Sequence, residues 1–333
     1  MGESRYSVRP FRDDDYETRS RLATRLEPDR PFTAKELRQW DRIFREPQLV
    51  KLDFIVEERA SGVGVAYGSL HHIPDMYHPR RFWTEVEVDP DHQHRGIGRM
   101  LYEQLEGLAH ARSVEVLWAG VRADDLRSVR FFERTGFAVR RRSWMSRLSL
   151  EAATPERLGV GQRGPISGVT FTTLAEEGAS RRDVQERLYR LDLETRRDAP
   201  RMEKMTDISF EQYSEHTFRD PRYDPEAVFL ARVGDEYVAM STLHHWPAEP
   251  DTLMVGFTGT LPAYRGRGLA TELKRRAVEF ARTRGYQYLR TFNDSENPRI
   301  WAINQKIGFQ VQRVWLMGEK RFGPGPGTAP LST

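Results

Sequence analysis

The stretch Pro90-Asp91-His92-Gln93-His94-Arg95-Gly96-Ile97-Gly98 decides the fold, together with a second copy that begins at Pro262. That copy reads Pro262-Ala263-Tyr264-Arg265-Gly266-Arg267-Gly268-Leu269-Ala270, so both fit Pro-x-x-[QR]-x-x-G-x-[GA]. A strand-like run precedes each copy, and an apolar stripe at helical spacing follows it. Because a helix N-terminus leaves backbone N–H groups unpaired and glycine permits close approach to a ligand, each loop suits a pyrophosphate.

The loops belong to a longer internal repeat with an offset of 172 residues. Residues 86–141 align without a gap with residues 258–313, and Gly136-Phe137 falls on Gly308-Phe309. A period this long indicates two copies of one domain. We therefore predict domains at 1–150 and 169–322, a linker rich in proline and glycine at 151–168, and a disordered tail at 323–333.

Both halves show the same order of expected elements. A polar, helix-rich segment comes first, at 14–47 or 176–217, and strand-like runs follow at 49–57, 63–71, 82–88 and 114–119, or at 228–233, 237–244, 253–260 and 286–292. The central strand–loop–helix element and the mixed order predict an α/β (α+β) fold with helices on both sides of a mixed sheet.

Composition excludes several function classes. The 333 residues carry a net charge of +3 and no cysteine, which rules out disulfides, cysteine-ligated zinc, iron–sulfur clusters and a cysteinyl intermediate. The N-terminus is charged, and no apolar run is long enough to span a bilayer, so we expect a cytoplasmic protein with no membrane partner. The near balance of charge gives no reason to expect a nucleic-acid partner, and the histidine pairs give none to expect a metal.

Further residues extend the pattern toward a known family. The strand–loop–helix segment resembles motif A of the GCN5-related N-acetyltransferases (GNAT). The segments Asp125-x-x-Ser128-x-x-Phe131-Phe132-x-x-x-Gly136-Phe137 and Asn297-x-x-Ile300-x-x-Ile303-Asn304-x-x-x-Gly308-Phe309 are similar to their motif B. The two-copy layout resembles tandem acetyltransferases such as mycothiol synthase.

This resemblance implies acetyl-CoA as the cofactor, bound in each half beside a splayed strand. Val88 and Thr260 would pair through their backbones with the pantetheine amides, and Ser128 and Asn297 would lie along the cofactor. Asn297 equally suits a helix N-cap ahead of Pro298. The loop residues that would hold the pyrophosphate are Gln93, His94, Arg95, Gly96, Ile97, Gly98 and Arg99, and Arg265, Gly266, Arg267, Gly268, Leu269, Ala270 and Thr271.

The acid and base of acetyl transfer are less evident. In much of the family a tyrosine of motif B protonates the leaving thiolate, but that position is Phe132 in one half and Asn304 in the other. Asn304 can hydrogen-bond the cofactor but cannot act as an acid, so water or a tyrosine from elsewhere would supply the proton.

Candidate bases lie on the strand that precedes the loop in the first half. Glu85 and Glu87 share one face of that strand and could take the proton of an amine. The structural alternatives are a solvated strand face or an ion pair with Arg80 or Arg81. The second half has no carboxylate there, so its candidate base shifts to His244 or His245.

The sequence thus predicts an acetyltransferase that acts on an amine by direct, base-assisted attack. A small molecule or a peptide could be the acceptor, and the divergent segments 14–47 and 176–217 would select it. The alternatives are that one or both halves are non-catalytic acyl-CoA-binding modules, or that decayed copies bind nucleic acid. Tandem copies can pack as a pseudo-dimer within one chain, so we expect a monomer or simple homodimer.

Overall fold

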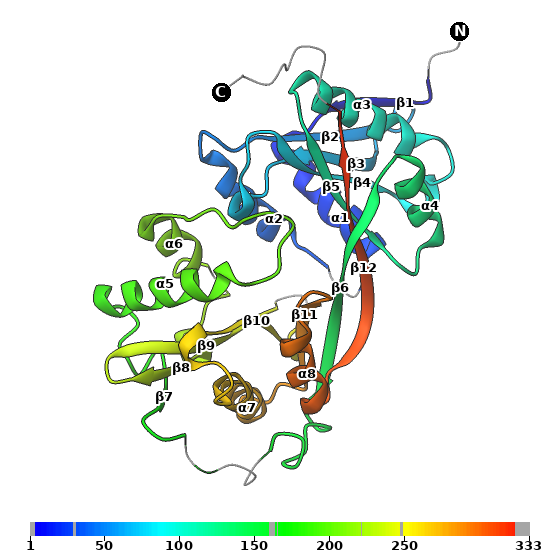
Figure 1. Ribbon diagram of the computed structural model, residues 1–333. Coiled ribbons are helices and arrows are strands. Elements are labelled where there is room, and N and C mark those ends of the chain that lie inside the picture. The colour runs from blue at the N-terminus through cyan, green and yellow to red at the C-terminus, as the bar shows by residue number, and fades with distance from the viewer. Residues whose placement is uncertain are drawn as a thin grey trace. The chain divides into compact units, whose positions relative to one another are not determined.

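The computed structural model describes residues 4–28, 31–159, 164, 166–220, 222–246 and 249–323 (Figure 1). The chain forms two compact units. The first comprises Met1–Arg140 and Leu316–Thr333, and the second comprises Arg141–Trp315. Both units contain a mixed sheet with helices packed against it, which confirms the predicted α/β (α+β) class. Of the predicted tail 323–333, only Gly323 is among the described residues.

The first unit follows the predicted order of elements. Its strand order is β1-β2-β3-β4-β5-β12, with the start of β6 next to β12. The elements are β1 (Tyr6–Pro10), α1 (Tyr16–Leu26), α2 (Ala34–Asp41), β2 (Lys51–Glu58), β3 (Gly64–His71), β4 (Arg81–Val88), α3 (Ile97–Ala111), β5 (Val116–Arg122), α4 (Leu126–Arg134) and the last part of β12 (Gln310–Arg321).

Two layers of helix cover the sheet of the first unit. The predicted apolar stripe of α3 is buried, and Leu101 packs so closely on Gly68 of β3 that a Cβ there would lie 2.7 Å from its side chain. On the opposite face α1 contacts β3 and β4. Alternation along β4 therefore sends Val86 toward α3 and sends Glu85 and Glu87 toward α1.

The second unit repeats this order. Its strands run β6-β11-β10-β9-β8-β7, with α7 on one face of the β8–β9–β10 sheet and α5 on the other (Figure 1). The elements are β6 (Ala138–Ser149), β7 (Thr170–Thr173), α5 (Arg182–Arg197), α6 (Phe210–Thr217), β8 (Val228–Val233), β9 (Glu236–His245), β10 (Thr252–Thr260), α7 (Leu269–Thr283), β11 (Tyr288–Asp294) and α8 (Pro298–Ile307).

Two strands have residues in both units. β6 begins in the first unit and continues into the second from Arg141, whereas β12 begins in the second and continues into the first from Leu316. Part of the stretch predicted as a linker, 151–168, packs in the core of the second unit, where Ala153 and Leu158 are buried. Among the described residues, no helix is both long and apolar enough to cross a membrane.

Candidate active site

In both units the strand–loop–helix element has the same backbone path. A single 3-10 turn, Pro90–His92 or Pro262–Tyr264, leads into the loop, and the helix begins directly after Gly96 or Gly268. Both glycines adopt left-handed conformations, with φ of 79° and 88°. A side chain at either position would strain the backbone, so glycine is required where the chain turns into the helix.

The loops leave a run of backbone donors without acceptors. Among the described residues, the N–H groups of 93–99 in the first unit and of 266–271 in the second have no hydrogen-bond acceptor. These groups converge at a helix N-terminus, where the helix dipole also favours negative charge. The geometry therefore suits an anion such as a pyrophosphate in both units.

Side chains of the loop motif hold its shape. Gln93 Nε2 donates to the carbonyl oxygen of Val88 at 3.1 Å, and Arg265 Nε donates to that of Thr260 at 3.0 Å. Each ties the end of the strand to the loop. Sequence reasoning gave these two residues a role only through their amides.

Other side chains of the two loops contact nearby carbonyl oxygens, the following helix or the core. Arg95 and Arg267 fold back to donate to carbonyl oxygens of the preceding turn, and Arg99 pairs with Glu103 on α3. Two apolar residues that follow the glycines are buried in the cores beneath the loops, namely Ile97 and Leu269. Gly98 lies in the first turn of α3, and Ala270 and Thr271 lie in the first turn of α7.

The parallel strands beside each loop separate as they approach it. β4 pairs with β5 only from Arg81–Val116 to Trp83–Trp118, and β10 pairs with β11 only from Thr252–Tyr288 to Val255–Thr291. The later residues of β4 and β10, including Val88 and Thr260, do not pair with that neighbour. In each unit the strand edge that leads to the loop is thus not paired with its parallel neighbour.

Glu85 and Glu87 lie on β4 where it diverges from β5. The sequence alternative of an ion pair with Arg80 or Arg81 is wrong for Glu85, which is 3.6 Å from Arg19 of α1, while Arg80 pairs with Glu115. Glu87 is half-buried, and its Oε2 is buried and has no hydrogen-bond partner among the described residues. Burial, with a further contribution from the nearby charge of Glu85, raises the pKa of Glu87 to about 8.

A network of charged and polar groups adjoins these glutamates on the same face of the sheet. Lys51 contacts Asp41 at 2.5 Å and Asp53 at 2.8 Å, and Ser69 donates to Asp53 at 2.6 Å. The β2–β3–β4 register brings Asp53, Ser69 and Glu85 into one row. Sequence reasoning missed this network, although the alternation of Lys51 and Asp53 along β2 was a weak signal.

Tyr67 lies beside Glu87 in the β3–β4 register and was also missed. Its ring lies beneath the guanidinium of Arg19, 4.5 Å from ring centroid to Cζ. Its hydroxyl is buried, with no hydrogen-bond partner in the part of the chain that the structure describes. Burial raises the pKa of Tyr67 well above its usual value, so the phenol stays protonated.

The corresponding face of the second unit has a different chemistry. The β9–β10 register shifts between Val255 and Thr258, and Phe257 lies in this irregular stretch with Arg196 of α5 over its ring at 4.3 Å. The β9–β10 pairing is regular again from Thr258, with Gly259 opposite Met240. This face of β10 therefore carries no carboxylate.

His244 lies on β9 against Gly256, where a Cβ would be 2.3 Å from its Nε2. Its Nδ1 is buried and has no hydrogen-bond partner within the described ranges, and burial lowers the pKa of the ring to about 4. The ring is therefore neutral at pH 7 but a weak base. His245 is exposed and lies 2.9 Å from the hydroxyl of Tyr286 through its Nδ1.

The motif B residues begin two helices. The Ser128 hydroxyl donates to Asp125 at 2.6 Å, and Asn297 accepts from the amide of Ile300 as the N-cap of α8. Phe132 is buried and stacked on Phe137 at 4.9 Å, so this position has a packing role.

Asn304 is buried in the second unit and belongs to a chain of amides. It donates through Nδ2 to Asn293 at 2.6 Å, and Asn293 donates to Ser146 at 2.8 Å. The Oδ1 of Asn304 is buried, and none of the residues that the structure describes forms a hydrogen bond with it. Asn293 and Ser146 were not predicted, because their contact depends on the pairing of β6 with β11.

Comparisons with known proteins agree with this geometry. The model of the acetyltransferase (GNAT) family matches residues 13–137 and 186–309. A ribosomal protein bS18-alanine N-acetyltransferase from Salmonella typhimurium is 44% identical over 52 residues, which are 16% of this chain and 35% of that protein, so the match spans about a third of its length.

Longer matches cover both units. A mycothiol acetyltransferase from Clavibacter sepedonicus is 24% identical over 232 residues, which are 69% of this chain and 70% of that protein. A tandem GNAT protein from the clavulanic acid biosynthesis pathway superposes with a TM-score of 0.74 at 19% identity, covering 96% of this chain and 99% of the other. The tandem arrangement expected from the sequence repeat is thereby confirmed.

Proposed function

Because the chain belongs to the acetyltransferase (GNAT) family, we propose that it transfers an acetyl group from acetyl-CoA to an amine, and that the transfer takes place in the first unit. Acetyl-CoA supplies an acyl group that is already activated as a thioester. The observation that carries the proposal is the position of Glu87, a carboxylate with a pKa raised to about 8 at the point where β4 separates from β5.

The loops of both units would hold the cofactor through their backbones. The free N–H groups of 93–99 and 266–271 would bind the pyrophosphate. The edges of β4 at Val88 and β10 at Thr260, which do not pair with the parallel neighbouring strand, would bind the pantetheine. Ser128, Asn297 and Asn304 would then lie along the cofactor. This placement of the cofactor is supported by the backbone donors without acceptors at the helix N-termini and by the parallel strands that stop pairing as they approach the loops.

Glu87 would act as the general base. An amine is protonated in water near neutrality and must lose a proton before it can attack. A carboxylate with a pKa near 8 is ionised often enough to accept that proton and basic enough to hold it. Glu85, close to Arg19, would raise the basicity of its neighbour and orient the incoming ammonium group.

The charge on the same face favours a cationic acceptor. Asp41, Asp53 and Glu85 outnumber Arg19 and Lys51 before Glu87 is counted. An ammonium group approaching Glu87 would add positive charge to an acidic excess. The helix α1 covers this face and α2 packs against α1, so the divergent segment 14–47 would shape the acceptor site.

A proton must also reach the thiolate that leaves. Phe132 cannot supply it, and Tyr67 is the tyrosine that lies beside Glu87. We assign this step to Tyr67 or to water. In the second unit His244, with a pKa of about 4, is a far weaker base at pH 7 than Glu87, which is the reason to assign the transfer to the first unit.

The test is an acetyl-transfer assay that follows thiol release from acetyl-CoA in the presence of di- and polyamines, amino sugars and short peptides, with acetylated products identified by mass spectrometry. We expect transfer to at least one cationic amine and a loss of about 10²–10⁴-fold in the E87Q variant. The matched control is E115Q, since Glu115 pairs with Arg80 at the surface. Transfer by a folded E87Q variant at the wild-type rate would refute the assignment.

A further inference from the structure

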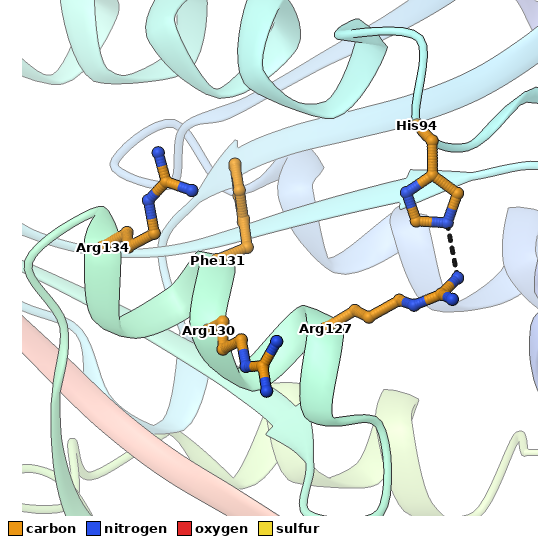
Figure 2. A pocket seen from close by; sticks show the side chains of 5 residues that line it. All are labelled: His94, Arg127, Arg130, Phe131 and Arg134. Atoms are coloured by element: carbon orange, nitrogen blue, oxygen red, sulfur yellow. Dashed lines mark hydrogen bonds between the residues drawn. The ribbon is translucent and has the colours of Figure 1, made fainter.

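A cavity of about 420 Å³ lies between the first loop and α4 and is not used by the proposed reaction. It is lined by His94, Arg127, Arg130, Phe131 and Arg134 (Figure 2). His94 extends from the loop, and the other four residues come from α4. The cavity therefore adjoins the backbone donors proposed for the pyrophosphate.

The arginines of this cavity form a concentrated positive charge. Arg127, Arg130 and Arg134 are spaced by three and four residues, which places them on one side of α4, and all three are exposed. Among the described residues, none of them forms an ion pair with a carboxylate. Like charges at this spacing destabilise a helix, so an anionic ligand would relieve the repulsion.

His94 ties this cluster to the loop. It has a positive φ of 64°, which is uncommon for a residue other than glycine, and its Nε2 lies 2.7 Å from Nη1 of Arg127 (Figure 2). Because a guanidinium can only donate, Nε2 must be the acceptor. The contact fixes the first arginine next to the free amides of the loop.

We propose that this cavity binds the 3′-phosphate on the ribose of acetyl-CoA, so that the first unit selects acetyl-CoA over the form without this phosphate. The inference rests on the proposed function, because the loop must hold the pyrophosphate for the ribose to reach α4. A phosphomonoester is close to dianionic at neutral pH, and guanidinium groups bind it through paired, charge-assisted hydrogen bonds. Phe131 gives the cavity an aromatic wall beside the charged groups.

The second unit keeps only part of this arrangement at the aligned positions. With the offset of 172 residues, Arg299 and Lys306 align with Arg127 and Arg134, whereas Gly266 replaces His94, Ala302 replaces Arg130 and Ile303 replaces Phe131. The second unit thus has two of the three cations but neither the histidine of the loop nor the aromatic residue. The complete arrangement, and the discrimination that we infer from it, belong to the first unit.

The experiment is calorimetric titration with acetyl-CoA and with acetyl-dephospho-CoA, which differ only in the 3′-phosphate. Every protein carries G268E, which blocks the second loop. We expect this parent protein to bind acetyl-CoA at least about 10-fold more tightly than acetyl-dephospho-CoA. The double variant R130Q/R134Q, which leaves the contact between His94 and Arg127 intact, should lose most of that difference while its affinity for acetyl-dephospho-CoA stays unchanged.

The matched control is R59Q/R112Q, which removes the same charge from exposed arginines of the first unit that do not line the cavity. Thermal unfolding establishes that all variants are folded. Equal affinity of the parent protein for both ligands would overturn this inference alone, as would an equal loss for both ligands in R130Q/R134Q. Failure of both ligands to bind would overturn the proposed function and this inference together.

Discussion

The environment of Glu87 sets the pH dependence expected of acetyl transfer. With a pKa of about 8, roughly one in eleven of these carboxyl groups is ionised at pH 7 and about ten in eleven at pH 9. If Glu87 is the base, kcat/KM therefore rises about 10-fold between these pH values through this group alone. His71, on the same face, has a pKa lowered from its usual value by burial and so titrates below this range.

The informative perturbation is E85Q. The charge of Glu85 raises the pKa of Glu87, whereas that of Arg19 lowers it. Replacing Glu85 by glutamine removes the first influence and leaves the charge of Arg19 offset by Asp41, 3.5 Å away, but no longer by Glu85, so both changes lower the pKa of Glu87. The rising limb of the profile should move to lower pH, and the ratio of rates at pH 9 and pH 7 should fall. The pKa of the free acceptor amine is unaffected, so a limb due to the amine would not move.

The assay is thiol release from acetyl-CoA between pH 6 and pH 9.5 at constant ionic strength, with kcat/KM determined at each pH. The E115Q variant controls for the loss of a carboxylate elsewhere in the unit. If the limb has the same midpoint in the wild type and in E85Q, Glu87 is not the group that titrates, and the assignment of the base fails.

Three further outcomes follow from the geometry. In calorimetry with acetyl-CoA, G96E should lose one binding site, because φ is 79° at this position and the free amides would face a carboxylate. The control G98A should keep that site, since a Cβ there has only an ordinary contact at 3.6 Å. A site that survives G96E would contradict the loop assignment. The ring of His244 has a pKa lowered from 6.5 to about 4, so on acidification the unfolded chain takes up the proton first. The free energy of unfolding of the wild type should therefore fall by up to about 2 kcal/mol between pH 7 and pH 5. In urea unfolding, H244Q should lose less stability over this range, and equal losses in both proteins would contradict this. N304A leaves the Oδ1 of Asn293 without its donor and should lower stability by about 1–3 kcal/mol, so an unchanged Tm would show that the amide chain carries no stability.

The loop and its helix could be predicted because their determinants are local. A glycine with positive φ and an apolar stripe at helical spacing are visible within about twenty residues, and the structure places Gly96 and the stripe from Ile97 as expected. The internal repeat shows the same loop and stripe a second time, which strengthens the prediction. The side-chain bond from Gln93 to Val88 was not foreseen, although its parallel at Arg265 explains why both loops have a long polar side chain at this position.

The charged face of the first unit could not be predicted in the same way. Its contacts join residues that are far apart in the chain, such as Arg19 with Glu85 and Ser69 with Asp53. Which residues meet depends on the register of β2, β3 and β4 and on where α1 crosses them, and a shift by one residue would send every side chain to the other face. The sequence showed that Glu85 and Glu87 share a face but not which cation approaches it.

The two units have similar loops for the cofactor but differ in the residues available for acid–base chemistry. In each unit a side chain of the loop bonds the end of its own strand, Gln93 to Val88 and Arg265 to Thr260, and the free amides are present although the strands carry different residues. In each unit an arginine of a helix lies over an aromatic ring on the sheet, but its carboxylate partner differs. In the first unit Arg19 lies over Tyr67 and close to Glu85. In the second unit Arg196 lies over Phe257 and pairs with Asp192. A carboxylate at 257 would lie beside that guanidinium, which would lower its pKa. The raised pKa of Glu87 comes instead from burial and from a second carboxylate that engages the cation, so a base at this site requires the pair of glutamates together with the helix that covers them.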